Sequence, residues 1–98
     1  MVDDALQFEW DPEKERANLQ KHGVSFLTAA ETFDHRMIDQ VDDRRDYGEV
    51  RLIALGRADG KVYRVVYTWR GDARIRIISA RKASRHEREE YLRDLHDE

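Results

Sequence analysis

The sequence predicts one α+β domain in which two N-terminal helices precede an antiparallel sheet and a third helix follows it. Three observations support this order. Apolar residues recur at helical spacing in the first third of the chain, β-branched and aromatic residues fill the second half, and a helix-capping pattern begins at Ser84. The 98 residues suffice for one hydrophobic core and leave no room for two. Residues 1–98 are therefore expected to form a single domain.

The first two helices are marked by their ends. Asp11-Pro12 is typical of an N-cap followed by the first helical position, because Pro lacks the amide hydrogen that would stay unpaired there. A helix is thus expected from Glu13 to about His22, ended by Gly23, which tolerates positive φ. Ser25 can cap a second helix, whose apolar face would carry Phe26, Ala29, Ala30 and Phe33.

The strands are predicted from runs of β-branched and aromatic residues. Phe8-Glu9-Trp10 can form a short strand or an anchor, and residues 35–41 are a weak strand candidate. A β-meander is expected from residues 50–55, 61–70 and 73–80. The capping-box spacing of Ser84-Arg85-His86-Glu87 predicts a last helix from Arg85 to about His96. We expect the helices to cover one face of the sheet and leave the other open.

The turn between the last two strands decides which side chains share a face. A two-residue turn at Gly71-Asp72 would pair Trp69 with Arg74 and Tyr67 with Arg76. Because side chains alternate, the core face would then carry Val66, Thr68, Ile75 and Ile77, with Arg64 and Arg81 towards its far end. The opposite face would carry Tyr63, Val65, Tyr67, Trp69, Arg74, Arg76 and Ile78. A three-residue turn would exchange these faces.

Composition narrows the class of protein. The chain has no cysteine, which excludes disulfides, thiol nucleophiles and Cys-ligated zinc and fits a reducing compartment. The acidic start Met1-Val2-Asp3-Asp4 does not resemble a signal peptide, and no apolar run approaches the length of a membrane span. A cytoplasmic protein that does not contact membranes is expected.

The charge of the chain is unevenly distributed. Its net charge is −3, yet seven basic residues stand against two acidic ones between Arg70 and Arg88. Such a zone can attract a polyanion, and rings beside guanidinium groups can stack bases and bind phosphates. Uneven scatter of surface charge, with ordinary cation–π pairs, explains the same pattern. The charge distribution alone therefore does not distinguish a surface that binds a polyanion from an ordinary scatter of surface charge.

Two motifs resemble those of one family. Lys21-His22-Gly23-Val24-Ser25-Phe26 follows Phe8-Glu9-Trp10-Asp11 and Asn18, and Arg76-Ile77-Ile78-Ser79-Ala80-Arg81-Lys82-Ala83 precedes Glu87-Arg88 and Tyr91. Their order and spacing resemble BrnT toxins of bacterial type II toxin–antitoxin systems, over nearly the whole chain. The resemblance implies a RelE-like fold and a ribonuclease that halts growth by cutting RNA. It also implies a BrnA-like antitoxin that binds the toxin, contacts operator DNA and forms dimers of heterodimers with it.

Cleavage by such a ribonuclease would use the 2′-hydroxyl of the RNA as nucleophile. For charge stabilisation on the phosphorane we expect Arg76 and Arg81, with Arg64 and Arg70 as supporting phosphate contacts. Arginine stays protonated at neutral pH, so it serves poorly as acid or base. No metal or other cofactor is expected, because no ligand spacing links the four histidines His22, His35, His86 and His96.

The remaining candidates each have an ordinary structural alternative. His22 is the best proton-transfer candidate by its usual pKa, yet a His at a helix end often only complements the helix dipole. Tyr91 can act near the phosphate or simply dock the last helix on the sheet. Phe8 and Trp10 are expected in the core or facing the antitoxin. The further expected RNA contacts are Lys21, Tyr67, Trp69, Arg74 and Lys82.

Two other functions compete with a ribonuclease. A non-catalytic, toxin-like module could bind an antitoxin and modulate its DNA binding with the same fold and the same partner. A repressor that binds DNA directly is disfavoured, because no helix-turn-helix pattern is visible and most of the chain is acidic. Expression of the chain alone distinguishes the first two, since only the enzyme would cut RNA.

Overall fold

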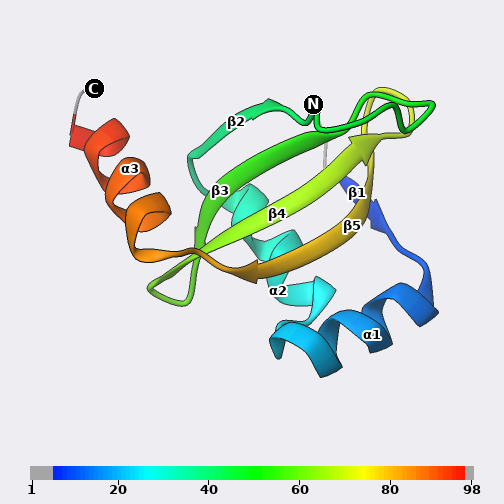
Figure 1. The fold of residues 1–98 in the computed structure, drawn as a ribbon, viewed down its shortest axis with the longest axis horizontal. Helices are drawn as coiled ribbons and strands as arrows, with labels where there is room; N and C mark the ends of the chain where they lie inside the picture. Colours follow the sequence, from blue (N-terminus) through cyan, green and yellow to red (C-terminus); the bar gives the residue numbers. More distant parts are fainter. Residues whose placement is uncertain (1–5, 97–98) are drawn as a thin grey trace.

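The computed structural model describes residues 6–96 as one five-stranded sheet with helices on both of its faces (Figure 1). The elements in chain order are β1 (Gln7–Glu9), α1 (Pro12–His22), α2 (Phe26–Glu31), the short 3-10 helix η1 (Thr32–Asp34), β2 (Met37–Val41), β3 (Leu52–Ala58), β4 (Lys61–Trp69), β5 (Arg74–Lys82) and α3 (Arg85–His96). The spatial order of strands is β1-β5-β4-β3-β2. Only the β1–β5 pair is parallel among these strands. The predicted α+β order is confirmed, and the parallel first strand is an addition to it.

The predicted helix ends are confirmed. The Asp11 carboxylate accepts a hydrogen bond from the Glu13 amide at 2.8 Å, and Gly23 ends α1 with φ of 70°. Ser25 Oγ accepts from the Thr28 amide at 3.1 Å at the start of α2. The capping box of α3 also forms, because the Glu87 amide donates to Ser84 Oγ and the Ser84 amide donates to Glu87 Oε1.

The main core lies between the sheet and helices α1 and α2, which cover what we call the α1/α2 face. Strands β4 and β5 contribute Val65, Tyr67, Ile75 and Ile77 to it, each at most 3% exposed. An aromatic row continues this core, with ring centroids 5.3 Å apart for Phe8–Phe33 and 5.0 Å for Phe33–Tyr67. Phe8 and Trp10 both pack against the core, as one of their two predicted roles requires.

The predicted register of the β4–β5 hairpin is wrong by one residue. The Arg70 amide donates to the Arg74 carbonyl at 2.8 Å, so the loop between them has three residues. Trp69 then pairs with Ile75 and Tyr67 with Ile77, and Ile78 is an extra residue at a bulge. Burial determines the register, because this pairing places Ile75, Ile77 and Tyr67 on the same face of the sheet, against helices α1 and α2. The predicted face of rings beside Arg74 and Arg76 does not exist.

The expectation that all helices share one face is also wrong. Leu55 and Val62 pack against Tyr91 of α3, whereas their neighbours Ala54 and Tyr63 belong to the core under α1 and α2. Adjacent strand residues point to opposite faces, so α3 packs on the other side of the sheet. We call this side the α3 face. It carries Leu55, Arg64, Val66, Thr68, Arg76 and Arg81.

Asn18 ties α1 to the edge of β5. Its Nδ2 donates to the Val24 carbonyl at 2.9 Å and to the Ala80 carbonyl at 2.8 Å, and its Oδ1 accepts from the Ala80 amide at 3.1 Å. The side chain therefore replaces the neighbouring strand that this part of β5 lacks. Asn18 is the buried residue of this largely polar helix, so its amide, rather than an apolar stripe, fixes α1 to the sheet.

Candidate active site

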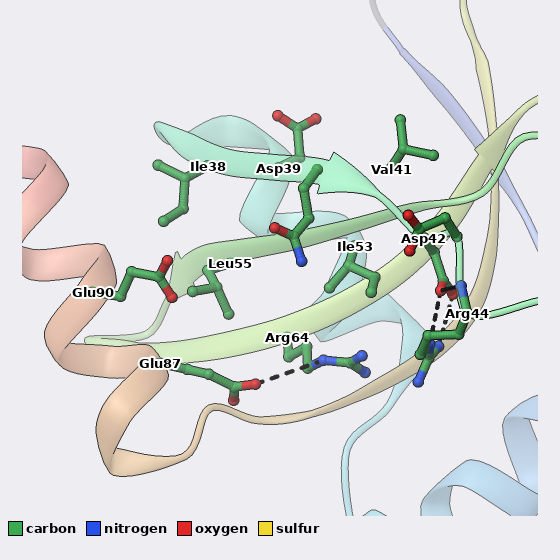
Figure 2. Close-up of a pocket in the computed structure, with 12 residues that line it drawn as sticks. Ile38, Asp39, Val41, Asp42, Arg44, Ile53, Leu55, Arg64, Glu87 and Glu90 are labelled. Atoms are coloured by element: carbon green, nitrogen blue, oxygen red, sulfur yellow. Dashed lines mark hydrogen bonds and ion pairs between the residues drawn. The ribbon is translucent and has the colours of Figure 1, made fainter.

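A cavity of about 430 Å³ opens on the α3 face (Figure 2). Its floor consists of Ile38, Ile53, Leu55 and the base of Arg64, from strands β2, β3 and β4. Helix α3 forms one wall with Glu87 and Glu90, and residues 42–44 after β2 form the opposite wall. The cavity thus joins an apolar floor to charged walls.

Arg64 lies at the centre of this cavity. Its side chain is only 16% exposed, and within residues 6–96 its guanidinium makes one ion pair, from Nε to Glu87 Oε2 at 3.7 Å, and no hydrogen bond. Burial lowers the pKa of Arg64, and the nearby guanidinium groups of Arg81 and Arg44 lower it further. No side-chain nitrogen of the described residues is both buried and unpaired. The N–H donors of Arg64 therefore face the cavity.

Glu87 holds Arg81 beside Arg64. The two arginines are cross-strand neighbours, and Arg81 donates to the two Glu87 oxygens at 2.8 and 2.9 Å. These hydrogen bonds, with that from the Ser84 amide, lower the pKa of Glu87 to about 2 against the opposing effect of burial. Glu87 is thus ionised at neutral pH. It fixes the position of Arg81, and it is a poor proton acceptor.

The opposite wall contains a second fixed ion pair. Arg44 donates from Nε and Nη2 to the two oxygens of the buried Asp42, each at 2.7 Å, and the Tyr47 hydroxyl donates to the same carboxylate at 3.1 Å. The Arg44 hydrogen bonds hold the pKa of Asp42 well below its usual range. Three guanidinium groups, of Arg44, Arg64 and Arg81, therefore act on one another across the cavity, and Arg64 alone among the three lacks a hydrogen-bonded carboxylate.

The other arginines of the hairpin lie outside the cavity and are paired. Arg76 donates to Glu9 at 2.9 Å, Arg74 donates to Gln7 at 3.1 Å, and Arg70 lies 3.5 Å from Glu49. Carboxylates from β1 and the β2–β3 connection thus offset the basic zone that the sequence shows. Of the arginines proposed for charge stabilisation, the structure brings together Arg64 and Arg81 and leaves Arg76 apart.

The aromatic residues proposed for RNA contact lie on the α1/α2 face. Tyr67 is buried there, donates to Asp39 at 2.8 Å, and has a pKa raised by that burial and then by the hydrogen bond. It cannot stack a base in this conformation. Trp69 stays 45% exposed at the end of β4. Lys82 is exposed and pairs in register with Tyr63, away from Arg64.

The proposed proton-transfer groups do not reach the cavity. Lys21 and His22 are exposed at the end of α1 and line a separate shallow hollow with Lys14 and β5. Tyr91 is 1% exposed and donates to the Arg36 carbonyl at 2.8 Å, so it docks α3 on the sheet. These positions match the structural alternatives given for His22 and Tyr91.

Sequence reasoning missed two parts of the site. Glu87 was considered for proton transfer and as a capping residue, and its ion pair appears only once β5 places Arg81 against α3. Nothing in the polar segment 42–49 indicated that Asp42 is buried and forms an ion pair with the more exposed Arg44. Among residues 6–96, no three His, Asp or Glu side chains gather to hold a metal ion. The described helices include none long and apolar enough to cross a membrane.

Comparison with known proteins identifies the family. The family model described as "Ribonuclease toxin, BrnT, of type II toxin-antitoxin system" matches residues 10–87. The crystal structure of the Brucella abortus ribonuclease toxin BrnT superposes with a TM-score of 0.63 at 28% sequence identity, covering 83% of this chain and 100% of that chain. No curated protein sequence matches significantly. The family match spans most of the chain, and the chain therefore belongs to the BrnT ribonuclease toxins of type II toxin–antitoxin systems.

Proposed function

We propose that this toxin cuts RNA without a metal ion, and that Arg64 binds the scissile phosphate in the cavity beside α3. One observation carries this assignment: a largely buried guanidinium that makes no hydrogen bond with the described residues. The unbonded N–H groups of Arg64 are open to the cavity, so a ligand there can accept hydrogen bonds from them without breaking a bond inside the protein. A phosphate oxygen is the acceptor that a guanidinium fork fits best.

The chemistry is transfer of the phosphodiester to the neighbouring 2′-oxygen. A bond forms between the 2′-oxygen and phosphorus while the bond to the 5′-oxygen breaks, which leaves a 2′,3′-cyclic phosphate and a 5′-hydroxyl. The 2′-hydroxyl loses its proton to an acceptor and the 5′-oxygen gains one. Negative charge gathers on the non-bridging oxygens, where Arg64 donates and Arg81 adds positive charge. The nucleophile belongs to the RNA, so no metal-bound water is required.

The carboxylates of the walls serve this reaction as positioning groups. Glu87 and Asp42 are already neutralised by Arg81 and Arg44, so neither repels a phosphate as a free carboxylate would. The fixed pairs also limit the movement of the cavity walls, which places Arg64 without an entropy cost at the moment of reaction. This arrangement supports stabilisation of the negative charge on the phosphate oxygens. It does not identify the groups that take the proton from the 2′-hydroxyl and give one to the 5′-oxygen.

A type II toxin has a cognate antitoxin, and we propose a BrnA-like protein for this chain. It would bind the toxin tightly, form dimers of heterodimers, and carry the contact with operator DNA. Free toxin would act on RNA in the cytoplasm, where loss of messages slows growth.

Expression of the chain alone in bacteria tests the assignment. Wild type should slow growth, and the purified protein should cut RNA equally well with and without EDTA. Arg64→Ala should cut about 100- to 1,000-fold more slowly, because it removes a donor to the developing charge. Arg57→Ala is the matched control, since Arg57 is exposed on the neighbouring strand β3 and does not line the cavity.

Each failure points to a different error. Equal rates for Arg64→Ala and wild type would show that the phosphate binds elsewhere. Loss of cleavage in EDTA would contradict a metal-free reaction. A wild-type chain that binds its antitoxin and never cuts RNA would instead be the non-catalytic module.

A further inference from the structure

The cavity is larger and more apolar than a phosphate site requires. Its volume of about 430 Å³ lies within the range of roughly 300–1,000 Å³ found for small-molecule sites. Ile38 and Leu55 lie on the floor beside Glu90 of α3, and Ile53 continues that floor towards residues 42–44 (Figure 2). Aliphatic side chains on adjacent strands offer a surface against which a flat ring can pack.

Three exposed polar side chains at the cavity, those of Gln40 on β2, Asp43 after β2 and Glu90 on α3, make no hydrogen bond or ion pair with residues 6–96. Asp43 belongs to the wall formed by residues 42–44, whereas Gln40 lies on β2 and Glu90 lies on α3. Figure 2 shows Glu90 beside Ile38 and Leu55, at the opposite end of the floor from Arg44. The free carboxylate thus lies over the apolar floor and apart from the phosphate position at Arg64.

The chemistry of these groups selects a nucleobase. A carboxylate only accepts hydrogen bonds, and guanine presents two adjacent donors, N1–H and N2–H, on one edge. The Gln40 amide can donate to the neighbouring O6. Adenine, cytosine and uracil offer a single donor group on the corresponding edge, so they would leave the carboxylate with half of its partners.

We propose that the floor formed by Ile38 and Leu55 beside Glu90 binds the base next to the scissile phosphate, and that Glu90 and Gln40 select guanine. This inference rests on the proposed phosphate site at Arg64. The phosphate would lie at the centre of the cavity, and the base would lie towards Glu90. The toxin would then cut RNA at guanine, always at the same position relative to the cut.

Sequencing of cut sites in a mixed RNA pool tests this proposal. Wild type should place guanine at one fixed position beside the cut about ten-fold more often than other bases, within the range of discrimination known for paired hydrogen bonds to a base. Glu90→Gln should reduce that preference to about two-fold, because one acceptor oxygen is replaced by a donor. Glu89→Gln, one residue earlier and outside the cavity, should keep the wild-type preference.

The outcomes separate this inference from the proposed function. Cleavage that depends on Arg64 without any base preference, or with a preference unchanged in Glu90→Gln, would overturn the base site alone. If the chain does not cut RNA, the base site can still be tested by NMR titration of the wild-type protein with 3′-GMP, 3′-AMP, 3′-CMP and 3′-UMP. Tightest binding of 3′-GMP, weakened in Glu90→Gln, supports the site. Equal binding of all four, or none at millimolar concentration, overturns it and would leave the cavity to a protein partner.

Discussion

The two faces of the sheet differ in how completely their polar groups are bonded. On the α1/α2 face the residues are apolar and closely packed, and the polar groups that enter it, such as the Tyr67 hydroxyl, are hydrogen-bonded. On the α3 face charged residues surround a cavity whose central guanidinium makes no hydrogen bond with the described residues. The difference indicates that the α1/α2 face provides most of the stability of the fold. The α3 face has hydrogen-bond donors and acceptors that remain available to a ligand.

The largest effect expected on stability comes from the α1/α2 face. Ile77→Ala should lower the free energy of unfolding by about 2–5 kcal/mol, since Ile77 is 1% exposed and its removal leaves a cavity. Ile53→Ala on the cavity floor should cost roughly half as much, because that side chain is only partly buried. Urea unfolding monitored by circular dichroism measures both. Similar losses at the two positions would remove the contrast between the faces.

Removal of the Asn18 amide should also destabilise this face. Asn18→Ala leaves the Ala80 amide and carbonyl without their partner, which should cost about 3 kcal/mol. Gln20→Ala, on the exposed side of the same helix, is the control and should change stability little. Hydrogen exchange should quicken first at the Ala80 amide. An unchanged exchange rate there would mean that α1 does not hold the β5 edge through Asn18.

On the α3 face the Glu87 ion pair should appear as a pH dependence. Its pKa of about 2, against 4.5 ordinarily, means that the unfolded chain binds the proton first as the pH falls. The stabilisation is therefore complete above about pH 5 and is lost between about pH 5 and pH 2. Glu87→Gln should lose about 1.5–3 kcal/mol at neutral pH and show a flatter profile in that window. Parallel profiles for variant and wild type would contradict the Arg81–Glu87 contact.

The smallest expected effect is that of salt on cleavage. Two phosphate contacts by arginine should slow cleavage at limiting RNA about five- to ten-fold between about 50 and 200 mM salt, because binding releases counterions. The salt dependence should become weaker in Arg64→Ala. A cleavage rate that does not change with salt concentration would argue against phosphate contacts on the α3 face.

The fold was predictable where local chemistry decides it. Asp11-Pro12, Gly23, Ser25 and the Ser84–Glu87 box act within one helical turn, so their residue types reveal them. The hairpin register depends on which face buries Ile75 and Ile77. The three-residue loop sets the register of these two residues, and the bulge at Ile78 shifts the pairing by one more residue beyond them. Such a long-range choice leaves no local signal, and it moved Arg76 away from Tyr67.

The candidate site was likewise predictable only where residue type indicates it and not where long-range pairing decides it. Arg64 and Arg81 were selected by residue type, and the structure places Arg64 in the cavity with Arg81 as its cross-strand neighbour, whereas Arg44, which also lines the cavity, was not selected. The carboxylate that pairs with both Arg74 and Arg76 is that of Glu9 on β1, whose parallel pairing with β5 the sequence did not reveal. The side of the sheet on which α3 packs was likewise undetermined, because the residues after β5 allow either direction.

The most direct test of ligand binding by Arg64 measures stability and cleavage on one variant, Arg64→Met. Methionine keeps the apolar stem and removes the charge, so we expect cleavage slowed about 100-fold or more with the free energy of unfolding unchanged or increased. Such a result would show that Arg64 serves a ligand and not the fold. A variant that unfolds more easily in proportion to its loss of activity, or that cuts RNA like wild type, would contradict the account.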